Sequence, residues 1–179
     1  MKEKKKIILG VTGSIAAYKA ADLASRFVQK GHQVFVVMTP EAERFIAPLT
    51  LQAITRNKVG RDMFEAPEAW DIEHVALADS ADLVVIAPAT ANVIGKLAAG
   101  LCDDLLTCAV TATKAPVLIA PAMNEGMYTH KAVQRNVETL KKMGYRFVGP
   151  DKGRLACGKT GVGRMSDVEA IVRAAGELL

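Results

Sequence analysis

The sequence predicts one α/β domain with a doubly wound parallel sheet and helices on both faces. Five short apolar runs lack polar alternation, which is typical of strands that are buried on both faces. Each run is followed by a segment with helical spacing, and this alternation indicates a parallel sheet. At 179 residues, the chain has the usual length for one domain, and we expect residues 1–179 to share one core.

The five predicted strands share β-branched and other apolar residues and end at a turn residue; they cover 6–11, 33–39, 82–88, 116–121 and 145–149. Helices are expected over 15–30, from Pro40 to about 55, as one or two segments over 92–114, and over 130–143, where Gly144 follows. Ser166 and Glu169 have the spacing of a capping box, which predicts the start of a last helix.

Charge and composition exclude several classes of partner. The formal net charge is +4, and Lys2, Lys4, Lys5 and Lys6 against Glu3 contribute +3 of it, so the body of the chain is nearly neutral. A nucleic-acid binder would show a clustered basic face, and none is visible. No apolar run approaches the ~18 residues of a membrane span and no signal peptide is evident, so we expect a cytoplasmic protein without a membrane partner.

The three cysteines are odd in number and show no CxxC spacing. This pattern favours neither a disulfide framework nor a metal site. Cys102 and Cys108 lie in helical, alanine-rich sequence, which predicts small core residues. Cys157 differs because it lies in "RLACGKTGVGRM", residues 154–165, where glycines and cations predict a flexible, electropositive loop with an exposed thiol. A plain surface turn is the alternative interpretation of this loop.

Ligands of doubly wound sheets bind outside the carboxyl ends of the strands. This rule selects Gly13-Ser14, Thr39-Pro40, 88–92 and 121–124, which we expect along one edge of the sheet. "GVTGSIAAYK" places a glycine turn before a helix N-terminus, which favours a phosphate. It lacks both the G-x-G-x-x-G and the P-loop spacing, so a mononucleotide phosphate is more plausible than NAD or ATP. Gly13 could also serve the turn alone.

Two strand ends share one pattern, "APATAN" and "APAMN". In each, a proline ends a buried strand and small alanines would let a flat ligand approach the backbone. Each could be an ordinary strand end, but their recurrence favours a shared ligand platform.

The histidines differ in the chemistry that they suggest. His74 precedes the third strand among apolar neighbours, where it is either structural or a general base with a pKa suited to neutral pH. His32 follows a helix stop and is expected at the surface. His130 lies near a helix start and has no evident partner in the sequence.

Taken in order, "GVTGSIAAYK", "DIEHVALADSADLVVIAPATAN", "CDDLL", "PAMNEGMY" and "ACGKTGVGRM" resemble the homo-oligomeric flavin-containing cysteine decarboxylases. Within them, the chain is most similar to the phosphopantothenoylcysteine decarboxylases of coenzyme A biosynthesis, over about residues 7–179. The resemblance implies a Rossmann-like, flavodoxin-like fold and FMN as the cofactor.

The resemblance also implies where the ligands bind. The residues implied to hold FMN are Gly13, Ser14, Ile15, Thr39, Ala89, Thr90, Ala91, Asn92 and Ala122. Those implied to contact the substrate are Asn124, Met127, Ala156, Lys159 and Arg164, and residues of about 151–165 would form a substrate flap. No metal is implied.

In the chemistry that the resemblance implies, the substrate thiol is oxidised to a thioaldehyde, CO₂ is lost, and FMNH₂ returns a hydride to give 4′-phosphopantetheine. His74 would act as a base near the thiol, Asn124 would bind the substrate carboxylate, and Cys157 would supply the final proton. The flap glycines would act as hinges that close over the substrate.

The resemblance further implies a homotrimer or a trimer-based assembly, and a fused or separate phosphopantothenoylcysteine synthetase as partner. A peptidyl-cysteine decarboxylase that stops at the enethiol is one alternative, and a non-catalytic regulatory flavoprotein is another. Whether the chain is a stand-alone enzyme or one domain of a bifunctional protein stays open at this point.

Overall fold

The computed structural model describes residues 4–63, 73–156 and 158–179, with residues 73–76 described by their backbone alone. Two predicted site residues fall outside this description: the side chain of His74 and the whole of Cys157.

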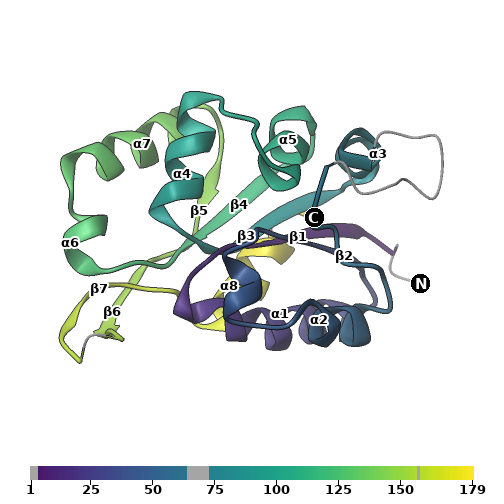
Figure 1. The fold of residues 1–179 in the computed structure, drawn as a ribbon, viewed down its shortest axis with the longest axis horizontal. Helices are drawn as coiled ribbons and strands as arrows, with labels where there is room; N and C mark the ends of the chain where they lie inside the picture. Colours follow the sequence, from purple (N-terminus) through teal and green to yellow (C-terminus); the bar gives the residue numbers. More distant parts are fainter. Residues whose placement is uncertain (1–3, 64–72, 157) are drawn as a thin grey trace.

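A five-stranded parallel sheet with the order β2-β1-β3-β4-β5 forms the centre of the molecule (Figure 1). The strands are β1 (Lys6–Val11), β2 (Gln33–Met38), β3 (Leu83–Ala89), β4 (Val117–Pro121) and β5 (Arg146–Phe147). All pairings are parallel, and β1 lies between β2 and β3, with Leu9 opposite both Val36 and Val85. The order is that of a flavodoxin-like doubly wound sheet, so the predicted fold class is confirmed.

Helices cover both faces of this sheet. The helical elements are η1 (Ile15–Tyr18), α1 (Lys19–Gln29), η2 (Ala42–Arg44), α2 (Pro48–Thr55), α3 (Glu73–Ser80), α4 (Ala91–Ala99), α5 (Leu105–Ala112), α6 (Glu125–Tyr128), α7 (Lys131–Lys142) and α8 (Val168–Gly176). In Figure 1, α1, α2 and α8 lie on one face, and α3, α4, α5 and α7 lie on the other. None of these helices, over the ranges given above, is long and apolar enough to serve as a membrane span.

The two faces of the sheet bury two separate apolar clusters because successive residues of a strand point in opposite directions. Ile7 and Leu9 of β1 pack into the cluster that includes Phe27 of α1 and Ile171 of α8. Ile8 packs into the other cluster, against the face covered by α4, α5 and α7. The unbroken apolar character of β1 in the sequence is therefore explained by burial on both sides.

The segment predicted as a flexible loop forms a β-hairpin instead. Its strands, β6 (Asp151–Arg154) and β7 (Thr160–Arg164), pair antiparallel in a sheet of their own. Glycine is rare in strands, so the sequence did not predict β7. In the structure, Gly161 of β7 pairs with Gly153 of β6. The hairpin extends from the edge of the molecule near α6 (Figure 1).

The predicted capping box at the start of the last helix is wrong. Asp167, not Ser166, is the N-cap of α8, and it makes no side-chain capping bond. The Ser166 hydroxyl instead donates a hydrogen bond to Asp151 Oδ1, at 2.7 Å. This bond links the loop before α8 to the first residue of the hairpin.

The cysteine prediction also needs correction. Cys102 is exposed in the loop between α4 and α5, and Cys108 is partly buried in α5. Gly100 and Asp104 interrupt the helical sequence, since the first adopts a left-handed conformation after α4 and the second caps α5. Cys102 is therefore not a core residue.

Candidate functional site

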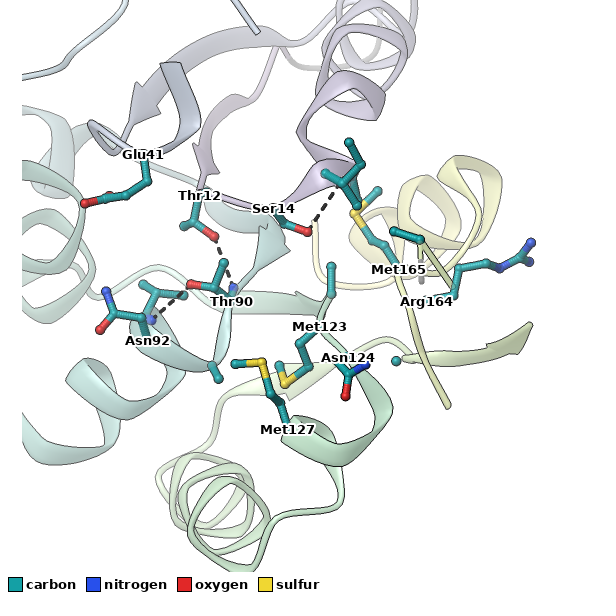
Figure 2. Close-up of a pocket in the computed structure, with 18 of the residues that line it drawn as sticks. Thr12, Ser14, Glu41, Thr90, Asn92, Met123, Asn124, Met127, Arg164 and Met165 are labelled. Carbon is teal, nitrogen blue, oxygen red and sulfur yellow. Dashed lines mark hydrogen bonds between the residues drawn. The ribbon is translucent and has the colours of Figure 1, made fainter. Parts of the chain in front are cut away.

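One large cavity of about 940 Å³ lies at the carboxyl ends of the parallel strands, with the hairpin as its outer wall. Its lining comes from Thr12–Ala16, Tyr18, Lys19, Thr39, Glu41, Thr90–Val93, Lys96, Asp104, Ala122–Asn124, Met127, Arg154–Ala156 and Gly163–Met165. All four of the strand-end segments selected from the sequence contribute to it, so the expectation that they share one edge is confirmed. Figure 2 shows the side chains of Ser14, Thr90, Met123 and Met165 around this space.

The turn after β1 forms an anion cradle. Ser14 is the N-cap of η1, and its Oγ accepts a hydrogen bond from the Ala16 N–H at 3.3 Å. A Cβ atom on Gly13 would lie 2.4 Å from Cβ of Glu41, so only glycine permits this close approach of the two strand ends. Gly13, Ser14 and Ile15 all line the cavity, and a glycine turn that leads into a helical turn favours a phosphate.

Thr39 completes this cradle from the end of β2. The residue is only 8% exposed, and its Oγ1 has no hydrogen-bond partner among the described residues. A buried hydroxyl without a partner costs free energy, and Thr39 is one of the residues that line the cavity, so a bound ligand is a candidate partner. A phosphate ester bound at Ser14 would supply the missing acceptor, so the residues present fit FMN.

The wall after β3 is fixed by one buried threonine. The Thr12 hydroxyl donates to the Pro88 carbonyl at 2.8 Å. It also accepts from the Thr90 N–H at 3.1 Å, the bond drawn between these two residues in Figure 2. Thr90 in turn caps α4, because its side chain accepts from the Val93 N–H. These bonds hold the small side chain of Ala91 at the cavity, where a flat ring could approach.

The wall after β4 carries the "PAMN" segment. The Ala122 N–H donates to the Ala89 carbonyl at 2.9 Å, which joins the two similar strand ends. Asn124 caps α6, since its Oδ1 accepts a hydrogen bond from the Gly126 N–H at 2.8 Å. The side chain that faces the cavity is thus oriented by the helix that it begins.

The hairpin approaches this wall so closely that it requires a glycine. The Met123 N–H donates to the Gly163 carbonyl at 2.9 Å. Gly163 has φ +139°, and a Cβ atom there would lie 2.2 Å from the Met123 carbonyl oxygen. Glycine alone combines this conformation with this contact.

A charged cluster closes the cavity on the side of α4 and α5. Lys96 Nζ lies 2.8 Å from Asp103 Oδ1 and 3.0 Å from Asp104 Oδ2. Burial raises the pKa of Asp104, but hydrogen bonds from Thr107 and Lys96 outweigh burial and hold that pKa below its usual range. The hydrogen bond to Asp103 is the main cause that raises the pKa of Lys96. Both Lys96 and Asp104 are therefore charged at neutral pH.

The structure brings most of the sequence-predicted site residues together. The predicted residues that line the cavity are Gly13, Ser14, Ile15, Thr39, Thr90, Ala91, Asn92, Ala122, Asn124, Met127, Ala156 and Arg164. Two predicted residues are not part of the lining: Ala89 is fully buried behind it, and Lys159 is exposed on the hairpin. Residues 73–80 form α3, but the position of the His74 side chain lies outside the described part.

Sequence reasoning missed several lining residues. Thr12 was not selected because it precedes the glycine turn, and Arg154 was counted only among the cations of the loop that holds Cys157. Lys96 and Asp104 lie in predicted helical sequence, and only the "CDDLL" motif drew attention to that region. His130, which had no evident partner, has a local role, because its Nδ1 accepts from the Ala132 N–H at 3.2 Å and caps α7.

Among the described residues, no group of three or more histidine, cysteine or acidic side chains is placed to hold a metal ion. The cavity instead combines an anion cradle, a wall of small residues and an oriented amide. This combination defines a nucleotide-binding α/β protein of the doubly wound class. A family model described as Flavoprotein matches residues 1–179, and the chain belongs to that family.

The most similar relatives divide into fused and single-domain proteins. The chain is 50% identical over 175 residues to the coenzyme A biosynthesis bifunctional protein CoaBC of Bacillus subtilis, covering 98% of this chain and 43% of that protein. It is 43% identical over 171 residues to a probable phosphopantothenoylcysteine decarboxylase of Streptococcus mutans, covering 94% of this chain and 96% of that protein. The chain thus spans less than half of the bifunctional relatives and nearly all of the single-domain one.

Solved structures with the same fold support this assignment. A PPC decarboxylase mutant complexed with pantothenoylaminoethenethiol has a TM-score of 0.85 and 33% identity, and the match covers 98% of this chain and 100% of that one. The FMN-dependent cysteine decarboxylase SpaF has a TM-score of 0.79 and 34% identity, with coverage of 96% and 97%. The FMN-binding protein AtHal3 has a TM-score of 0.84 and 32% identity, with coverage of 98% and 96%.

Proposed function

We propose that this chain catalyses the FMN-dependent decarboxylation of 4′-phosphopantothenoylcysteine to 4′-phosphopantetheine in coenzyme A biosynthesis. The observation that carries the proposal is that the phosphate cradle at Ser14 and Thr39 and the oriented amide of Asn124 face one cavity. The single-domain relative from Streptococcus mutans, which this chain matches over 96% of its length, supports the same reaction.

The residues of the cradle and of the two alanine-rich walls would hold the cofactor. The Thr39 hydroxyl and the turn at Ser14 would bind the FMN phosphate, and Ala91 and Ala122 would leave room for the ring system. When bound there, FMN supplies a two-electron acceptor that can later return the electrons. The protein's own residues bind and orient the substrate against it.

Asn124 is suited to hold the substrate carboxylate. Its Oδ1 already accepts a hydrogen bond from the Gly126 N–H, so the Nδ2 amino group is the half of the amide that can donate to a carboxylate. An amide carries no full charge, so it does not stabilise the carboxylate strongly against departure as neutral CO₂. We therefore assign to Asn124 the binding of the group that leaves.

Arginine side chains of the hairpin would bind the substrate phosphate. Arg154 on β6 and Arg164 on β7 both line the cavity, whereas Lys159 does not. Arg164 is also within 3.5 Å of Asp167, which holds its guanidinium at the base of the hairpin. A planar guanidinium can bind phosphate through two parallel hydrogen bonds.

The roles of His74 and Cys157 remain proposals that rest on the family resemblance. His74 would act as the base near the substrate thiol, and Cys157 would supply the proton that completes the product. We expect Cys157→Ser to release CO₂ and to accumulate an enethiol in place of 4′-phosphopantetheine. Formation of 4′-phosphopantetheine at the normal rate by this variant would exclude the assigned role.

We further propose a homotrimer, or an assembly of trimers, as the resemblance implies. A phosphopantothenoylcysteine synthetase would work with this chain, either fused to it as in CoaBC or as a separate protein.

The deciding experiment is a substrate assay with product identification. The purified protein should show the absorption band of FMN and convert 4′-phosphopantothenoylcysteine into CO₂ and 4′-phosphopantetheine. A protein that is colourless and takes up no added FMN would refute the cofactor assignment. A yellow protein that leaves this substrate unchanged would refute the substrate assignment.

One observation favours a second candidate reaction. The likeness to SpaF, an FMN-dependent cysteine decarboxylase at 34% identity, is compatible with the alternative that the family resemblance leaves open, a peptidyl-cysteine decarboxylase that stops at the enethiol. The same assay separates the two candidates, because a C-terminal cysteine peptide should then be consumed in preference to 4′-phosphopantothenoylcysteine. The arginines at the cavity favour the phosphorylated substrate.

A further inference from the structure

The hairpin is attached to the Asn124 wall by two adjacent contacts. One is the backbone bond from the Met123 N–H to the Gly163 carbonyl, at 2.9 Å. The other comes from Glu125, whose Oε1 accepts a hydrogen bond from the Val162 N–H at 3.2 Å. The residues on both sides of Asn124 in the sequence therefore contact β7.

The carboxylate of Glu125 also fills the space above a glycine of β7. A Cβ atom on Gly161 would lie 2.4 Å from Glu125 Oε2 and 2.5 Å from its Cδ. Gly161 has no positive φ, so its backbone conformation does not require glycine. A side chain at this position would therefore have to displace the flexible Glu125 carboxylate.

Glu125 does not line the cavity, but the strand that it contacts does. Gly163 and Arg164 of β7 form part of the wall, directly after Val162. The contact uses the main chain of Val162, so it restrains the strand itself and not one mobile side chain. A hydrogen bond to a carboxylate is also stronger than a neutral one.

We propose that Glu125 is a positioning residue that holds β7 against the Asn124 wall and so sets the place of Gly163 and Arg164 at the substrate side of the cavity. The effect of Glu125 on turnover rests on the proposed function, and KM measures it. Its effect on the position of β7 does not rest on that function, and hydrogen exchange of the Val162 amide measures it.

The first test compares Glu125→Ala with Glu125→Gln in the FMN-loaded protein. Glutamine keeps an acceptor oxygen for the Val162 N–H, whereas alanine removes it. We expect alanine to raise KM for 4′-phosphopantothenoylcysteine about three- to tenfold with a smaller change in kcat, and to speed hydrogen exchange of the Val162 amide. Glutamine should restore most of both quantities, and FMN content should stay unchanged.

Glu177→Ala is the matched control, because it removes an exposed carboxylate at the end of α8. We expect this variant to leave both KM and the Val162 exchange rate at the wild-type values. A general loss of stability would instead change exchange throughout the sheet, for example at Leu9.

A double-mutant cycle tests the contact itself. In Gly161→Ala, the new methyl group should displace the Glu125 carboxylate and give the same rise in KM as Glu125→Ala. The double variant should then be no worse than either single variant, since both remove one interaction. Additive effects would show that the two residues act independently and would overturn the proposal.

The remaining outcomes are equally decisive. Wild-type KM and unchanged Val162 exchange in Glu125→Ala would overturn the proposal, as would a failure of glutamine to restore either quantity. If the wild-type protein leaves 4′-phosphopantothenoylcysteine unchanged, the proposed function fails, and hydrogen exchange of the Val162 amide alone tests the positioning role. Faster exchange in Glu125→Ala than in the wild type supports that role, and equal exchange refutes it.

Discussion

Two buried threonines at the cavity differ in how well their hydroxyl groups are satisfied. Thr12 makes two hydrogen bonds to the strand end after β3, whereas Thr39 Oγ1 has no partner among the described residues. The first residue therefore stabilises the fold, while the second has an unmet hydrogen-bonding capacity that a ligand can use.

Thr39→Val should separate ligand binding from stability. Valine removes a buried hydroxyl that has no partner without FMN, so the FMN-free protein should unfold at the same temperature or higher. FMN should bind about tenfold more weakly, because one hydrogen bond to the phosphate is lost. Thermal unfolding and flavin fluorescence titration measure the two quantities.

Thr12→Val is the control, and the opposite pattern is expected. It leaves the Pro88 carbonyl and the Thr90 N–H without their partner, which should destabilise the FMN-free protein by about 1–3 kcal/mol. Equal stability losses in the two valine variants would contradict the assignment of Thr39 to the cofactor.

Ser14, Thr39 and Asn124 could be predicted from the sequence because each lies at the end of a predicted strand or within three residues after it. It could not find Thr12 or Glu125, since their partners are 76 and 37 residues away along the chain. These contacts join segments that are far apart in the sequence and close only in the folded chain, so a local sequence pattern does not predict them.

At the scale of elements, the five strands and most of the helices were predicted, but the helix α3 was not. The strands β1 to β4 are strongly apolar and mostly buried, so a local pattern carries their assignment, whereas β5 is short and only partly buried. The hairpin was missed because β7 owes its strand conformation to pairing with β6 and to its contact with Met123, and its glycines argue against a strand. The false capping box has a similar cause, since Ser166 binds Asp151 across the hairpin base.

Gly163→Ala should detach the hairpin from the Met123 wall. The added Cβ would overlap a backbone oxygen, which cannot rotate away, so the strand itself must move. We expect a large loss of substrate affinity with FMN still bound, measured by KM and by flavin absorbance. Gly31→Ala provides the control, because Gly31 also has a positive φ, of +91°, but has open space around it.

The start of α5 should make stability depend on pH in the acid range. The pKa of Asp104 is lower in the folded state than in the unfolded state. Its charge therefore stabilises the folded protein fully at pH values above the unfolded-state pKa of about 3.9. This stabilisation is lost as the pH falls through the folded-state pKa. Asp104→Asn should therefore be less stable than wild type at pH 7 by about 1 kcal/mol, with the difference vanishing at strongly acid pH. Urea unfolding at several pH values checks this.

Asp103→Asn is the matched comparison, because Asp103 pairs with the same Lys96 but is 61% exposed. Its removal should cost less at pH 7, since exposed ion pairs contribute little. A larger loss in Asp103→Asn than in Asp104→Asn would contradict the importance of the capping carboxylate.

For the whole molecule, several large apolar side chains remain exposed. Ile15 and Tyr18 on η1 line the cavity and are 59% and 62% exposed, and Leu49 on α2 is 72% exposed. Exposed apolar side chains are compatible with the proposed assembly of copies.

Sedimentation or light scattering should therefore give three copies of the 19.1 kDa chain, or a multiple of three. Leu49→Glu should lower this mass if α2 lies at a contact between copies, because burying a carboxylate there is costly. A monomer at micromolar concentration would refute the proposed trimer.

The two-stranded sheet of the hairpin is separate from the five-stranded one, and this separation has a consequence for how the specificity of the cavity can change. The cradle and the alanine walls follow core strands, so a change in their backbone would disturb the sheet, although a single side chain such as that of Thr39 can be replaced. The hairpin is attached by a few local contacts, which include the Met123–Gly163 backbone bond, the Glu125 carboxylate and the Ser166–Asp151 hydrogen bond. Its sequence can therefore change with little effect on the cradle. We therefore expect that the β6–β7 hairpin can be exchanged as a unit. Replacing residues 151–164 by those of a relative should change the substrate specificity of the cavity while the five-stranded sheet stays the same.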